Sequence, residues 1–143
     1  FTFGDMSRLS SKTANYLESL GIGKGDKVLL VLKRHYQFWL ALTALHKIGA
    51  VAIPATNLLK EHDFEYRFKA GDVKAILCTS DGDTAEEAER ASKKCEDLKA
   101  KVIVGEPKDG WHDFDKEYES FSDVYDRKAD TPCGSDPALM FFT

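Results

Sequence analysis

The chain has 143 residues, of which 43% are hydrophobic and 31% are charged. This composition is typical of one folded domain with a single core and argues against intrinsic disorder. The formal net charge is -4, and no basic stripe with interleaved aromatic residues is present, which argues against a nucleic-acid-binding protein.

The first predicted helix has a clear start and a clear stop. Thr2 and Asp5 have the spacing of a capping box. Apolar residues then recur with the helical period until Gly21, a residue that commonly ends helices. We therefore predict a helix that runs from this cap to Leu20.

Strands and helices alternate along the next part of the chain. Short apolar runs predict strands at residues 27–33, 50–53, 75–79 and 101–104, and helical patterns span residues 36–48, 60–69 and 84–98. This order predicts an α/β fold, a doubly wound βαβ sheet with helices on both faces. Pro54 closes the second strand and cannot lie in a central ladder, and Thr84 and Glu87 have capping-box spacing.

The last part of the chain is polar and acidic from residue 105 to residue 136, with aromatic residues spaced for a short helix. A final strand is predicted over residues 138–142. No internal repeat is present, so residues 1–143 form one structural unit. Because the chain begins on Phe1 and ends on an apolar run at Thr143, we expect it to be an excerpt from a longer protein.

The sequence gives little support for a membrane-spanning protein or a metal-binding protein. The longest apolar stretch, residues 36–45, is about half the roughly 20 residues of a membrane span, and the first residues are too charged for a signal peptide. Cys78, Cys95 and Cys133 have no CxxC spacing, so neither a disulfide framework nor a zinc site is predicted. A reducing cytoplasm is the expected location.

Two groups of residues are candidates for binding anions. Lys33, Arg34 and His35 follow a predicted strand and precede a helix, where α/β sheets place ligands; they either contact an anion or cap the sheet edge in water. The glycines at positions 21, 23 and 25 follow a helix and precede a strand, the reverse of the dinucleotide-binding order, which favours a turn.

The remaining polar candidates have simple structural explanations. His46 and Lys47 lie where positive groups satisfy a helix C-terminus. His62 and His112 each have acidic neighbours but no second histidine at i+4, so solvated surface is favoured over a metal site. Arg67 either holds a phosphate or pairs with an acid on its own helix, namely Glu61, Asp63 or Glu65. The residues alone support no complete active site, so we assign no catalytic or metal-binding residue.

Three stretches together resemble the adenylate-forming (AMP-binding) superfamily of acyl-CoA synthetases, luciferases and adenylation domains. They are Phe1-Thr-Phe-Gly-Asp-Met6 with Leu20-Gly-Ile-Gly-Lys-Gly-Asp-Lys-Val28, then Ala44-Leu-His-Lys-Ile-Gly-Ala-Val-Ala-Ile-Pro54, and Ser135-Asp-Pro-Ala-Leu-Met-Phe-Phe-Thr143. Within that family the chain looks most like the acetyl to medium-chain acyl-CoA synthetases. The resemblance implies the N-terminal part of the large domain, truncated before the phosphate-binding loop.

The resemblance also implies a reaction and its partners for a full-length parent protein. A small carboxylic acid and ATP would give an acyl-adenylate, and CoA would then displace AMP, with Mg²⁺ stabilising the phosphate charge. Thr143 matches the edge of the ATP phosphate loop, and Arg67 resembles an arginine that contacts the CoA nucleotide. We expect the isolated chain to be inactive, to bind no cofactor tightly, and to self-associate through apolar surface around Trp39 and Phe141.

Two alternatives remain open at this point. The chain could belong to an adenylation domain that loads a carrier protein in place of CoA. It could instead be a stand-alone flavodoxin-like module that binds a nucleotide or effector.

Overall fold

The computed structural model describes residues 1–126, 128 and 130–142. In that part of the chain a five-stranded parallel sheet has the strand order β2-β1-β3-β4-β5. The strands are β1 Lys27–Val31, β2 Val51–Pro54, β3 Val73–Thr79, β4 Ala100–Val104 and β5 His112–Asp113. The helices are α1 Phe3–Ser19, α2 Gln37–Ile48, α3 Glu61–Ala70, α4 Thr84–Ser92 and α5 Phe114–Glu117, followed by the 3-10 turn Tyr118–Ser120.

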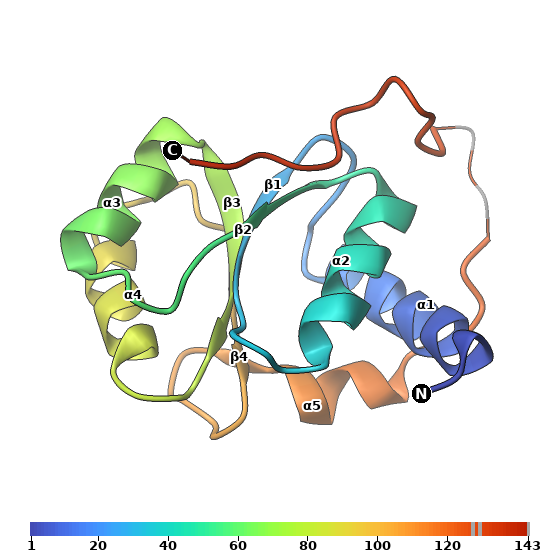
Figure 1. The fold of residues 1–143 in the computed structure, drawn as a ribbon, viewed down its shortest axis with the longest axis horizontal. Coiled ribbons are helices and arrows are strands. Elements are labelled where there is room, and N and C mark those ends of the chain that lie inside the picture. Colours follow the sequence, from blue (N-terminus) through green and yellow to red (C-terminus); the bar gives the residue numbers. More distant parts are fainter. Residues whose placement is uncertain (127, 129, 143) are drawn as a thin grey trace.

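The helices form two layers, one on each side of the sheet. Figure 1 shows α3 and α4 on one side and α1, α2 and α5 on the other. Successive strand residues point to opposite faces. On β1, for example, Val28 and Leu30 enter the α1–α2 core, whereas Leu29 and Val31 enter the α3–α4 core. Burial on both faces explains the continuous apolar runs in the sequence, and the predicted doubly wound α/β fold is confirmed.

The start of α1 agrees with the prediction in detail. The Thr2 hydroxyl accepts a hydrogen bond from the Asp5 amide at 3.0 Å, and the Asp5 carboxylate accepts one from the Thr2 amide at 3.1 Å. These two bonds satisfy backbone donors that a helix N-terminus otherwise leaves unpaired. The capping box predicted for this helix is therefore confirmed.

Helix α4 starts at Thr84 as predicted, but its predicted capping box and its predicted end at Leu98 are wrong. The Thr84 hydroxyl donates to the Asn57 carbonyl at 3.1 Å, and a Glu87 carboxylate oxygen accepts from the Glu61 amide at 2.8 Å. Both side chains are thus engaged by neighbouring segments, so no capping box forms. The helix ends at Ser92 because residues 93–98 turn back toward the start of β4.

The edge of the sheet at β2 is covered by the end of the chain. The Ala52 amide donates to the Ala138 carbonyl and the Met140 amide donates to the Ala52 carbonyl, each at 3.0 Å. The strand predicted over residues 138–142 is therefore reduced to one parallel bridge, between Ala52 and Leu139. Pro54 ends β2, an outer strand of the five, as its missing N–H requires.

The described helices are all too short or too polar to cross a membrane.

Glu87 links α4 to the first turn of α3, and its removal should therefore destabilise the fold. We expect Glu87→Ala to lower the free energy of unfolding by about 1–2 kcal/mol, because the partly buried Glu61 amide loses its charged acceptor and Arg90 loses a carboxylate at 2.8 Å. Glu86→Ala is the matched control, since the Glu86 side chain is on the same helix, is 59% exposed, and pairs with Lys108 at the surface. Urea unfolding of both variants measures the difference, and equal losses would contradict the capping role of Glu87.

Candidate functional site

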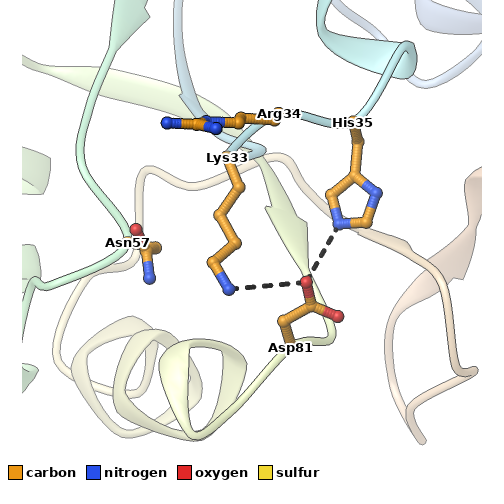
Figure 2. A pocket seen from close by; sticks show the side chains of 5 residues that line it. All are labelled: Lys33, Arg34, His35, Asn57 and Asp81. Atoms are coloured by element: carbon orange, nitrogen blue, oxygen red, sulfur yellow. Dashed lines mark hydrogen bonds and ion pairs between the residues drawn. The ribbon is translucent and has the colours of Figure 1, made fainter.

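A cavity of about 490 Å³ lies where three loops meet at the carboxyl ends of the parallel strands. Its lining residues come from the loops after β1, β2 and β3 and are Lys33, Arg34, His35, Asn57 and Asp81. Figure 2 shows these five side chains around the opening. Because parallel strands end at one edge, residues far apart in sequence meet there, as in other α/β sheets.

The loop after β1 turns sharply just beyond the buried Leu32. The His35 amide donates to the Leu32 carbonyl at 3.0 Å, and Lys33 adopts a left-handed backbone conformation with φ of 50°. This conformation is uncommon for a residue with a long side chain. The turn leaves Lys33 and Arg34 exposed above the sheet edge, while His35 is partly buried.

Asp81 orders two of the three basic residues. One of its carboxylate oxygens lies 3.6 Å from the Lys33 ammonium nitrogen and 3.3 Å from Nε2 of His35. The same His35 nitrogen lies 3.0 Å from the hydroxyl of Thr79, which also accepts the Asp81 amide at 3.1 Å. Thr79 is fully buried, so this cluster is anchored in the end of β3.

Arg34 is the cation of this cavity that no carboxylate neutralises. Within residues 1–126, 128 and 130–142, no hydrogen bond or ion pair engages its guanidinium. Two permanent cations, Lys33 and Arg34, therefore face one carboxylate, Asp81. The arrangement favours an anion, which is one of the two interpretations that the sequence left open for Lys33, Arg34 and His35.

The side chain of Arg67 lies away from this cavity, on α3. One guanidinium nitrogen donates to the Asp63 carbonyl at 3.3 Å, and the guanidinium carbon lies 5.2 Å from the centre of the Phe142 ring. The acids proposed as partners pair elsewhere, since Glu65 binds Lys69 at 2.8 Å. Arg67 thus contacts the end of the described chain, and Thr143, the other sequence candidate, lies outside the described residues.

The other sequence candidates are structural. Lys47 donates to the Ser7 carbonyl at 3.0 Å and the Ser11 hydroxyl at 2.8 Å, and burial lowers the pKa of its ammonium group. Burial raises the pKa of the Cys78 thiol to about 12, so this cysteine is an inert core residue. Among the residues that the structure describes, no cluster of histidine, cysteine and acidic side chains could hold a metal ion. The His62 side chain is 83% exposed, whereas His112 lies in β5 with its Nδ1 3.1 Å from a Glu117 carboxylate oxygen.

Sequence reasoning missed Asn57, Thr79 and Asp81. Each of them lies at or just beyond the end of a strand, as Lys33 does. The rule that singled out the loop after β1 would have found them if applied to the loops after β2 and β3 as well.

Comparison with known proteins gives one family for the whole chain. The family model described as "AMP-binding enzyme" matches residues 1–143. The mitochondrial acyl-coenzyme A synthetase ACSM5 of Rattus norvegicus is 35% identical over 116 residues, which are 80% of this chain and 20% of the relative. The mitochondrial ACSM1 enzyme of Mus musculus is 32% identical over 145 residues, 100% of this chain and 25% of the relative.

Solved structures of low sequence identity share the fold. A long-chain-fatty-acid-CoA ligase from Archaeoglobus fulgidus superposes with a TM-score of 0.85 at 17% identity, covering 100% of this chain and 27% of that one. A Brucella canis acyl-CoA synthetase gives a TM-score of 0.83 at 22% identity, covering 100% of this chain and 26% of that one. The chain therefore shares its α/β fold with these two solved structures.

The curated relatives correct one expectation and place the chain in a family. Both relatives are named as mitochondrial enzymes, which contradicts the cytoplasmic location expected from the sequence. That expectation was wrong because unpaired cysteines argue only against an oxidising compartment and do not identify which other compartment holds the protein. The chain spans only 20–25% of the length of these two relatives. Because the family model matches every residue from 1 to 143, the chain belongs to the AMP-binding enzyme family.

Proposed function

We propose that residues 1–143 are the N-terminal part of the large domain of a longer AMP-forming acyl-CoA synthetase. The observation that carries this proposal is the match along the whole chain to a family of AMP-binding enzymes, together with 32–35% identity to acyl-coenzyme A synthetases. The family match leaves no support for a stand-alone flavodoxin-like module.

The proposed reaction has two steps. A carboxylate oxygen of the acid attacks the α-phosphate of ATP, which forms an acyl-adenylate and releases pyrophosphate. The thiol of CoA, after losing its proton, then attacks the acyl carbonyl carbon, forms the thioester and releases AMP. Mg²⁺, where bound, would offset phosphate charge, but no cluster of metal ligands is present in the described residues, so we assign no Mg²⁺ ligand to this chain.

The contribution of this chain would be to position the segment that leads into the phosphate loop. The bridge between Ala52 and Leu139 holds this segment along β2. The rings of Tyr66 and Phe142 lie 5.9 Å apart, which ties it to α3 as well. We propose that Thr143, directly beyond this segment, is the first residue of the chain to reach ATP.

Arg67 is proposed to contact the nucleotide part of CoA. An arginine has five N–H donors, and one hydrogen bond, to the Asp63 carbonyl, is recorded for it. The guanidinium is partly exposed beside Phe142 and has no acidic partner among the described residues. It therefore has donors to offer a phosphate, with the Phe142 ring restricting its orientation.

The acid is proposed to be of medium chain length. The resemblance to known families covered enzymes for acids from acetate to medium-chain acids. The relatives named above are acyl-coenzyme A synthetases and give no support to acetate.

Acyl-CoA formation by the full-length protein tests the proposed function. We expect turnover that requires ATP and CoA, with octanoate a better substrate than acetate by at least about tenfold in kcat/KM, because a longer chain buries more apolar surface. Chain 1–143 alone should show no turnover with any acid. Product formation on a carrier protein but not on CoA would favour an adenylation domain, and no adenylate with any acid would contradict the proposal.

Arg67→Ala in the full-length enzyme tests the CoA contact. We expect the KM for CoA to rise roughly tenfold with the KM for ATP unchanged, because a charge-assisted hydrogen bond to phosphate is lost. Arg67→Lys should be intermediate, since it keeps the charge but not the paired donors. Lys69→Ala, on the same helix, is the control; a change in the KM for ATP, or a loss of stability with CoA binding intact, would instead indicate a structural role.

Chain 1–143 is predicted to self-associate. Trp39 and Phe141 are 58% and 63% exposed, which leaves large apolar side chains in water. Light scattering should show species larger than a monomer, and Trp39→Ser combined with Phe141→Ser should reduce them. Val124→Ser is the control. Val124 is also apolar and is 61% exposed, but it is not one of the two residues that we expect to drive association. A monodisperse monomer of the unmodified chain would contradict the prediction.

A further inference from the structure

We propose that Gly71 is a positioning residue for the ligase reaction. Because it has no side chain, it forms a seat at the end of α3 for the segment 138–142, and so fixes where the chain enters the phosphate loop. The inference rests on the proposed function, which puts ATP beyond this segment. Gly71 comes directly after Ala70, the last residue of α3.

The space around Gly71 requires a glycine, whereas its backbone conformation does not. Its φ is −87°, outside the left-handed region that favours glycine. A β-carbon here would lie 2.8 Å from the Arg67 carbonyl oxygen, 3.1 Å from Cζ of Phe142 and 3.2 Å from Cε of Met140. The contact with the carbonyl is too short, and that carbonyl is held in place because it accepts the Gly71 amide at 2.9 Å. A larger residue would therefore displace the helix end, the segment or both.

The two side chains on Gly71 are the inward side chains of the segment. Met140 and Phe142 pack against the α3–α4 core, whereas Leu139 and Phe141 are 46% and 63% exposed. This alternation is that of an extended chain with one face buried. Gly71 thus receives the side chains by which the segment is attached to the body of the fold.

Contacts from the end of α3 also orient the Phe142 ring. The Tyr66 ring lies 5.9 Å away at an interplanar angle of 70°, and the Arg67 guanidinium carbon lies 5.2 Å from the ring centre. Figure 1 shows the end of the chain beside α3. A methyl group on Gly71 would push the ring away from these partners. Thr143 follows Phe142 directly in the sequence, so a displaced Phe142 would shift the start of the phosphate loop.

The two steps of the proposed reaction depend differently on this seat. Adenylate formation requires the triphosphate to be aligned with the attacking carboxylate, and a misplacement of about 1 Å can slow such a step roughly a hundredfold. Thioester formation from a ready-made acyl-adenylate involves no triphosphate. A shift of the segment should therefore slow the first step and spare the second.

Gly71→Ala in the full-length protein tests the proposal. Exchange of pyrophosphate into ATP in the presence of octanoate measures the first step, and acyl-CoA formation from synthetic octanoyl-adenylate measures the second. We expect exchange to fall about tenfold and thioester formation to change by less than about twofold. Gly23→Ala is the matched control, because no atom lies within 4 Å of a β-carbon at Gly23, and it should leave both rates unchanged.

Phe142→Ala tests the same seat without adding an atom. It removes the ring that lies on Gly71 and should also slow exchange more than thioester formation. This second variant decides the question if urea unfolding shows that Gly71→Ala is not folded. Equal losses in both steps, or exchange as fast in the seat variants as in Gly23→Ala, would overturn the proposal. An unmodified protein that forms no adenylate with any acid would instead contradict the proposed function, and this proposal with it.

Discussion

The parallel pairing of the strands is the constraint on which the rest of the structure depends. Because β1, β2, β3 and β4 all run the same way, their carboxyl ends lie along one edge and their amino ends along the other. The strands β1, β2 and β3 are each followed by a helix that returns the chain, whereas a loop over residues 105–111 connects β4 to β5. The two helix layers bury both faces of the sheet. The loops at the carboxyl edge are the places where polar side chains can converge without disturbing that core.

The same constraint explains how the end of the described chain is placed. The segment 138–142 pairs with Ala52 near the start of β2, and Phe142 packs against Gly71 just before β3, so this segment ends near the amino ends of the strands. The guanidinium carbon of Arg67 lies 5.2 Å from the ring centre of Phe142, the last described residue of this segment. The arginine therefore has two roles compatible with its position, one that orients this segment and one that offers donors to a ligand. Because one side chain could serve both roles, separate KM values for CoA and for ATP distinguish them better than the free energy of unfolding does.

Periodic features were predictable from sequence, and contacts between distant segments were not. The apolar strands and the cap of α1 depend on neighbours in sequence, which is why they were predicted well. Thr84 and Glu87 have capping-box spacing, but tertiary partners in the loop before α3 and in its first turn take both side chains. Strand β5 has two residues and leaves no periodic signal. Asn57 and Asp81 join the basic cluster only because the sheet order places their loops beside it.

The central proposal is that this chain is part of a longer AMP-forming ligase whose ATP lies beyond the segment 138–142. A crystal structure of the full-length protein with ATP and Mg²⁺ tests it most directly. The account predicts that residues 1–142 keep the fold described here and that the triphosphate lies beyond Phe142, against the residues that follow it. A nucleotide bound remote from the end of this segment would contradict the account.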